Sequence, residues 1–269
     1  GGGLAAYSAD ITMTDTAVTG NSASFAGGAF YVNYSSITLT DVTTSGNAAT
    51  SIVYYGTGHG GGISSRHSTL TIDGGAISDN TAVGRGGGVN SYYDTVTISG
   101  STISGNAADN SGGLRTGGSD VTIDNTSIAN NTATYNGGGL SVSGGTLELT
   151  ANTISGNTAG ALGGGLYLGA PANIVNTTVS GNSAHSGAGF YVSGPATLTN
   201  VTMTGSTASY QSGGIHLGYV TVAFERSLIS GNAAPTADEI NNYNNASTLI
   251  ADAANVFGHD GQTAADAFV

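Results

Sequence analysis

A glycine-rich step recurs every 25 to 26 residues along this chain and constrains its fold more than any other feature. Repeats of this length are typical of solenoids, in which each repeat forms one coil that stacks on its neighbours. Reading the sequence from each step gives nine rows. They begin at Gly1, Gly27, Gly60, Gly86, Gly112, Gly137, Gly163, Gly187 and Gly213.

Each row carries apolar residues at four positions, such as Val89, Val96, Ile98 and Ile103 in the row from Gly86. The second and third positions are two residues apart, which is the spacing of side chains on one face of a strand. The segments are short, rich in β-branched residues and interrupted by glycine, which favours strands over helices. We therefore predict an all-β fold, a right-handed single-stranded parallel β-helix (β-solenoid) of about nine to ten coils with three short strands each.

The turn after the fourth apolar position has a fixed chemistry. It opens with Gly, Asn or Asp in every row, as at Gly20, Asp79 and Asn130, and these residue types tolerate a positive φ. The next residue is Asn in every row except one, which has Ser206, and an alanine follows two residues later. We predict a ladder of stacked amides inside this turn. It comprises Asn21, Asn47, Asn80, Asn106, Asn131, Asn157, Asn182 and Asn232.

Two paired motifs carry a resemblance to a known family. They are a Gly-Gly-apolar step, as in Gly164-Gly165-Leu166, and an apolar-x-x-Asn step, as in Ile154-Ser155-Gly156-Asn157. The chain resembles the pectate-lyase-like superfamily of β-helices, and within it the repeats of bacterial surface proteins such as the chlamydial polymorphic outer-membrane proteins. This resemblance implies the fold and a location outside the cell or on its surface. It leaves the function open, because adhesins, passenger domains and enzymes share such repeats.

The repeats predict a solenoid over residues 1–234. An insertion of about seven residues near 52–59, with Tyr54 and Tyr55, predicts a loop that leaves the second coil. From Pro235 the repeat fades, and we expect an irregular C-terminal segment over 235–269. The first glycine already lies inside a repeat, and no charged-then-apolar signal segment precedes it, so we expect the sequence to be a portion of a longer protein.

Charge argues against several classes of partner. Only 7% of residues are charged, the net charge is −12, and the four basic residues are all Arg. Arg66, Arg85, Arg115 and Arg226 lie in different stretches, so we expect no basic track and no nucleic-acid partner.

No apolar run reaches the roughly 18 residues that a membrane span needs. The chain has no Cys, which is compatible with an extracellular location.

Two pairs of residues are weak candidates for catalysis. Asp73 and Asp124 are expected at the same outward position two coils apart, roughly 9.6 Å by strand spacing, which is at the edge of the separation used by inverting glycosidases. No basic residue shares that position. Arg66 and His67 lie near His59 and the inserted loop, and the resemblance to lyases implies a role for Arg as base or clamp, although adjacent strand residues point to opposite faces. We therefore predict no catalytic residue.

Other surface residues suggest binding. Tyr31, Tyr167 and Tyr191 directly follow the first apolar position, so they point outward and could stack on sugars or cover strand surface. Outward threonines could bind ice, although acids and Asn173 interrupt their array. Carboxylates in turns could hold calcium, but the Gly-Gly-x-Gly-x-Asp repeat of calcium β-rolls is missing. We predict no metal and no cofactor.

The function that the sequence favours is a non-catalytic extracellular structural or adhesive β-solenoid of a bacterial cell surface or matrix. The partners would be surface glycans, or other copies of the chain that stack end to end into fibres through open coils. The first alternative is a polysaccharide lyase or glycoside hydrolase of the β-helix type, which would need acids and a basic group converging in one groove. The second alternative is an ice-binding or glycan-binding module.

Overall fold

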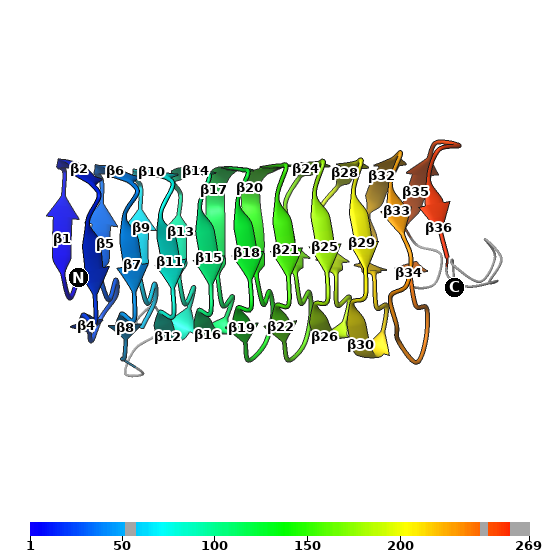
Figure 1. The fold of residues 1–269 in the computed structure, drawn as a ribbon, viewed down its shortest axis with the longest axis horizontal. Helices are drawn as coiled ribbons and strands as arrows, with labels where there is room; N and C mark the ends of the chain where they lie inside the picture. The colour runs from blue at the N-terminus through cyan, green and yellow to red at the C-terminus, as the bar shows by residue number, and fades with distance from the viewer. Residues whose placement is uncertain (52–57, 243–246, 259–269) are drawn as a thin grey trace.

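The computed structural model describes residues 1–51, 58–242 and 247–258, which form a parallel β-solenoid of about nine turns (Figure 1). Every element assigned over these residues is a strand, and the strands pair in parallel with those of neighbouring coils. The predicted all-β solenoid is therefore confirmed. The N-terminus and the last described strand, β36 (Val256–Phe257), lie at opposite ends of its long axis (Figure 1).

A typical coil contains four short strands, one more than the sequence predicted. In the first coil these are β1 (Leu4–Tyr7), β2 (Asp10–Thr14), β3 (Ala17–Thr19) and β4 (Ser22–Ala23). The first two belong to one sheet, and the last two belong to two further sheets. Ser8, with a φ of 49°, bends the chain between β1 and β2 without moving them into separate sheets. The coil thus has the three sheets expected from three strands, but one of those strands is split.

The largest sheet has 18 strands among the described residues. Besides β1 and β2 these are β5 (Phe30–Asn33), β6 (Ser36–Thr40), β9 (Ile63–Arg66), β10 (Thr69–Asp73), β13 (Val89–Tyr92), β14 (Thr95–Ser99), β17 (Leu114–Asp124), β20 (Leu140–Thr150), β23 (Leu166–Leu168), β24 (Ala172–Val175), β27 (Phe190–Val192), β28 (Ala196–Thr199), β31 (Ile215–Leu217), β32 (Thr221–Glu225), β34 (Ile240–Asn242) and β35 (Thr248–Ala251). In β17 and β20 the two strands of a coil run on as one.

The other two sheets have ten and eight strands in the part of the chain that the structure describes. The first contains β3, β7 (Thr43–Ser45), β11 (Ala76–Ser78), β15 (Thr102–Ser104), β18 (Ser127–Ala129), β21 (Thr153–Ser155), β25 (Thr178–Ser180), β29 (Thr202–Thr204), β33 (Leu228–Ile229) and β36 (Val256–Phe257). The second contains β4, β8 (Ala48–Ala49), β12 (Thr81–Arg85), β16 (Ala107–Asn110), β19 (Thr132–Ala133), β22 (Thr158–Ala159), β26 (Ser183–Ser186) and β30 (Thr207–Gln211).

The four apolar positions of each row form four columns inside the solenoid, as predicted. Ile63 pairs with Val89 and Val89 with Leu114, and the other three columns align in the same way. These side chains form one continuous core along the axis. The structure adds a further inward column that the sequence did not reveal, which includes Val32 and Val142.

The asparagine ladder is also confirmed. Asn131 is buried, and its Oδ1 accepts hydrogen bonds from both the backbone N and the Nδ2 of Asn106 at 3.0 Å. The residue before each ladder position has a positive φ, including Asp79 at 56° and Asn130 at 55°. At the C-terminal end the ladder meets the buried carboxylate of Glu239, which accepts a hydrogen bond from the amide of Asn232.

The solenoid continues beyond residue 234, which differs from the predicted irregular segment over 235–269. Strands β34, β35 and β36 pair in parallel with β31, β32 and β33. They find backbone partners on the previous coil even though the repeat of side chains has faded. The insertion near 52–59 appears as a jump in register, because Asn80 follows Asn47 by 33 residues, whereas Asn47 follows Asn21 by 26. Residues 52–57, with Tyr54 and Tyr55, lie outside the described residues.

Candidate functional site

The N-terminal half of the solenoid departs from the repeat in its interior. In the further inward column, Ser65, Ser91 and Thr116 stand between Val32 and Val142, and all three are buried. Buried polar groups destabilise a fold unless they are well bonded, and departures from the local pattern often accompany functional sites. Two surface depressions lie against this part of the solenoid.

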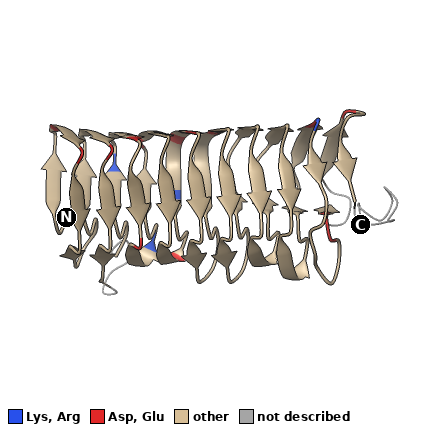
Figure 2. Cartoon of the chain, viewed as in Figure 1, with Lys and Arg blue, Asp and Glu red and all other residues tan. Residues whose placement is uncertain are grey.

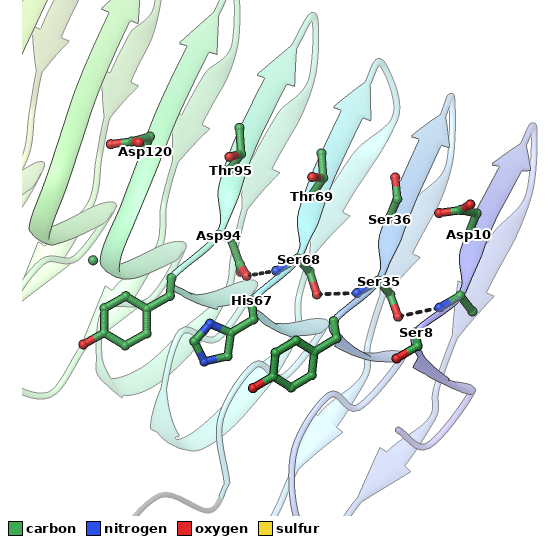
Figure 3. A pocket seen from close by; sticks show the side chains of 14 residues that line it. Ser8, Asp10, Ser35, Ser36, His67, Ser68, Thr69, Asp94, Thr95 and Asp120 are labelled. Atoms are coloured by element: carbon green, nitrogen blue, oxygen red, sulfur yellow. Dashed lines mark hydrogen bonds between the residues drawn. The ribbon is translucent and has the colours of Figure 1, made fainter.

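The first depression, which we call the aromatic groove, is open and has a volume of about 860 Å³ (Figure 3). Its distinctive feature is a stack of three rings, with His67 5.0 Å from Tyr34 and 5.4 Å from Tyr93 between ring centroids. All three residues have a positive φ, between 48° and 55°, because they occupy the bend between the two strands of the largest sheet. The groove is also lined by Ser8, Asp10, Ser35, Ser36, Ser68, Thr69, Asp94, Thr95 and Asp120, among others.

Hydrogen bonds from coil to coil form the floor of the aromatic groove. Ser35 Oγ accepts from Ala9 N at 3.1 Å, Ser68 Oγ accepts from Ser35 N at 3.1 Å, and Asp94 Oδ1 accepts from Ser68 N at 2.8 Å (Figure 3). The other oxygen of Asp94 accepts from Ser91 Oγ at 2.7 Å. Burial raises the pKa of Asp94, and these hydrogen bonds partly offset that effect. Both carboxylate oxygens have donors from the chain, so we interpret Asp94 as a structural residue.

The stacked rings of the aromatic groove cannot serve as a wide platform for sugars. Both faces of the His67 ring are covered, one by Tyr34 and the other by Tyr93. A sugar that entered would meet ring edges, hydroxyls and the carboxylates of Asp10 and Asp120. The groove therefore offers hydrogen bonds rather than stacking.

The second depression, which we call the arginine hollow, is smaller, with a volume of about 310 Å³. It gathers three of the four basic residues of the chain, Arg66 from β9, Arg85 from β12 and Arg115 from β17. Its other side chains come from the same few coils. They are Phe25, Ala26, Tyr31, His59, Ser64, Ser65, Asn90 and Tyr92.

This arrangement corrects the expectation that the arginines are scattered. Figure 2 shows most of the basic colour in the N-terminal half of the solenoid. Coiling brings residues about 25 positions apart into register, so that Arg66 pairs with Tyr92 and Arg115 with Asn90 on adjacent strands. Arg66 and Arg115 both lie over the Tyr92 ring, 5.6 Å and 6.0 Å from its centroid. Such cation–π contacts hold the guanidinium groups in place.

The electrostatics of the arginine hollow favour an anion. No Asp or Glu is among the described residues that line it. Burial, and then the charge of Arg85, lowers the pKa of Arg115 to about 10, so Arg115 stays protonated at neutral pH. Burial, followed by the charges of Arg85 and Arg115, lowers the pKa of His59 to about 4, so His59 is neutral. Since His59 Nδ1 accepts a hydrogen bond from Arg85 N at 3.1 Å, the neutral ring carries its proton on Nε2 and can donate it.

The predicted catalytic candidates do not converge. Asp73 and Asp124 share one outward column, as expected, with Ser99 between them donating to Asp73 Oδ1 at 2.7 Å. Neither acid lines the groove or the hollow. Arg66 and His67 are neighbours in sequence, but Arg66 lines the arginine hollow and His67 the aromatic groove.

The three predicted binding tyrosines separate into two environments. Tyr167 and Tyr191 stack at 5.2 Å, and Tyr191 also stacks on His216 at 5.1 Å, so both faces of its ring are covered. Tyr31 instead lines the arginine hollow, 6.1 Å from Phe25 in an edge arrangement. Sequence reasoning missed Arg85, Arg115, Asn90 and Tyr92, because nothing in a single row marks them. Writing the rows in register would have placed Arg66 beside Tyr92 and Arg115 beside Asn90.

The outward threonines form a column that is continuous over five coils from Thr12 to Thr122. The two adjacent outward columns contain acids, with Asp10 and Asp120 on one side and Asp73 and Asp124 on the other. These charges interrupt the uncharged surface that ice binding would favour. Ice binding itself stays a prediction.

Within the described ranges, no three His, Asp or Glu side chains come together as metal ligands would. In the same residues, no helix is long and apolar enough to cross a bilayer. No protein-family model, curated protein or solved structure matches the chain.

Proposed function

We propose that this chain is a non-catalytic adhesive solenoid of a cell surface or extracellular matrix, and that it binds glycans through the side of its N-terminal half. The arginine hollow carries this proposal, because it combines hydrogen-bond donors with aromatic side chains in a depression of ligand size. The resemblance of the repeats to those of pectate-lyase-like bacterial surface proteins supports an extracellular location.

The chemistry of the hollow supports binding rather than cleavage. Elimination from an acidic sugar requires a base, and hydrolysis requires paired carboxylates. At neutral pH Arg115 is protonated, burial raises the pKa of the Tyr31 phenol, and Nε2 of the neutral His59 ring bears a proton. These groups can orient and neutralise a ligand, but none of them is ready to accept a proton.

The test measures binding and turnover on the same samples. The purified chain is screened against immobilised neutral and acidic glycans, and each glycan that binds is then incubated with the chain and assayed for new reducing ends and for the ultraviolet absorbance of unsaturated products. We expect binding without product. A double variant, Asp73→Asn with Asp124→Asn, serves as the control and should bind equally well. Turnover that co-purifies with the chain and disappears in this variant would contradict the proposal.

A further inference from the structure

We propose that the arginine hollow selects an anionic sugar, with the carboxylate or sulfate of an acidic polysaccharide held by Arg66, Arg85 and Arg115. This inference rests on the proposed glycan-binding function and names the class of ligand. It follows from three separate features of the hollow.

The first feature is uncompensated positive charge. The chain has a net charge of −12, yet three of its four arginines gather where no acidic side chain among the described residues faces them. Arginine close to arginine is unfavourable, and burial of Arg115 adds to the cost of its charge. An anion would relieve both effects. A planar guanidinium also matches the two oxygens of a carboxylate or sulfate.

The second feature is the aromatic wall. Phe25 and Tyr31 border the same depression as the arginines, whereas the Tyr92 ring already has Arg66 and Arg115 over it. Aromatic side chains provide apolar surface for the C–H groups of a sugar ring, which a free inorganic anion lacks. The combination of charge and aromatic surface therefore fits an anion attached to a ring rather than sulfate or phosphate alone.

The third feature is the polar floor. Ser64 and Asn90 line the hollow and are 6% and 7% exposed. The Oδ1 atom of Asn90 has no hydrogen-bond partner among the described residues. This atom is closed to solvent, so it is not itself a contact for a ligand, and the floor is polar through the Ser64 and Asn90 side chains that line the hollow. The floor thus complements the hydroxyls of a sugar while the arginines complement its charge.

The size and the surroundings of the hollow argue against nucleic acid. Its volume of about 310 Å³ is at the lower end of the range for small-ligand sites, roughly 300–1,000 Å³. A nucleic acid needs a basic path along its backbone, whereas the fourth arginine, Arg226, directly follows β32, several coils away from β17 and Arg115. The neighbouring aromatic groove contains Asp10 and Asp120.

Isothermal titration calorimetry of the whole 269-residue chain tests the inference. The probes are an oligogalacturonate, a sulfated carrageenan oligosaccharide that carries no carboxylate, a neutral galactose oligosaccharide, sodium sulfate and an oligothymidylate. We expect at least one of the acidic oligosaccharides to bind, with an affinity that falls as salt is added, and the neutral sugar, sulfate and oligothymidylate to bind about tenfold more weakly or worse. Comparison of the two acidic probes tells whether the carboxylate or the sulfate is preferred.

The variants make the inference specific to the hollow. Arg66→Gln with Arg115→Gln should weaken binding of the acidic oligosaccharide about tenfold or more, since each change removes a charge-assisted contact. Arg226→Gln removes the same charge outside the hollow and should bind like the parent chain. Arg66 is exposed, so Arg66→Gln alone keeps the test valid if the double variant does not fold.

The inference and the proposed function fail differently. If neutral and acidic oligosaccharides bind equally, or if Arg66→Gln has no effect, the chain still binds glycans but the arginine hollow does not select an anion. If no glycan binds, both fail. Tighter binding of the oligothymidylate than of either acidic sugar would replace the inference with a nucleic-acid site.

Discussion

Replacing Asn131 with alanine should destabilise the solenoid strongly, although the side chain contributes nothing to the apolar core. Asn131 is fully buried. Its Nδ2 donates to Ile103 O at 2.9 Å and to Asn157 Oδ1 at 3.0 Å, and its Oδ1 accepts the two hydrogen bonds from Asn106 described above. The substitution therefore removes four hydrogen bonds at once.

A net contribution of about 1 kcal/mol per buried hydrogen bond predicts a loss of about 4 kcal/mol in the free energy of unfolding. For a chain of this size, each 1 kcal/mol corresponds to roughly 2–4 °C in the melting temperature, so we expect a decrease of about 10 °C. The backbone N–H of Asn106 also loses its side-chain acceptor. Hydrogen exchange at Asn106 should therefore accelerate more than exchange in distant coils.

Thermal and urea unfolding followed by circular dichroism provide the measurement. The control is Asn173→Ala, since that amide donates one hydrogen bond, to Glu148 Oε2, at the surface, and we expect a loss below about 1 kcal/mol there. Asn131→Asp is a second probe. Its carboxylate would face Ile103 O and Asn157 Oδ1, so its pKa should be raised in the folded state, and stability should fall as pH rises above the ordinary Asp pKa of about 3.9. If Asn131→Ala is no less stable than Asn173→Ala, the ladder does not hold the coils together.

Three further changes probe other parts of the solenoid. Because burial raises the pKa of Asp94 above its usual 3.8, the folded state holds its proton more tightly, so stability should fall as pH rises from 3.8 through the raised pKa, and Asp94→Asn should lack this part of the pH dependence. Gly138→Ala would place a methyl group 2.5 Å from a backbone oxygen of the next coil and should prevent folding, whereas Gly181→Ala meets nothing within 4 Å and should cost about 1–2 kcal/mol through its positive φ. Glu239→Gln replaces one of the two carboxylate acceptors by a donor and should speed hydrogen exchange at Gly231, whose backbone N–H donates to Glu239 Oε1 at 2.9 Å.

Each of these predictions would be contradicted by a specific measurement. An unchanged pH profile in Asp94→Asn, measured by urea midpoints at several pH values, would show that this carboxyl does not govern acid stability. Similar melting temperatures for the two glycine variants would contradict the close approach of the coils. Protection of the Gly231 amide that is unaffected by the glutamine would show that Glu239 does not hold the end of the ladder.

The sequence by itself determined the architecture. A row of 25 to 26 residues with apolar residues at fixed positions predicts which side chains face inward, because strand alternation and stacking leave no other arrangement. The Gly, Asn or Asp before each ladder asparagine predicts the positive φ of that turn, since few residue types adopt it. The columns from Leu4 to Ile215 and from Asn21 to Asn232 follow from local pattern alone.

The splitting of one strand in two could not be predicted in this way. The residues that bend the chain there include Tyr34 and Tyr93, bulky residues that rarely have a positive φ and adopt it because the adjacent coils hold them. Strands β34, β35 and β36 were missed for a similar reason. Backbone hydrogen bonds to the preceding coil form them after the apolar repeat has faded.

Only the tertiary structure decided where the candidate site lies. Arg66, Arg85 and Arg115 are far apart in sequence, and a count of charges presents them as isolated residues on an acidic chain. Residues one row apart in the sequence lie side by side in the solenoid, so coiling brings the three arginines together. The insertion in the second coil lengthens the separation between successive ladder asparagines from 26 to 33 residues. Whether an arginine faces an acid, an aromatic ring or another arginine is set by this register, and a single row carries no information about it.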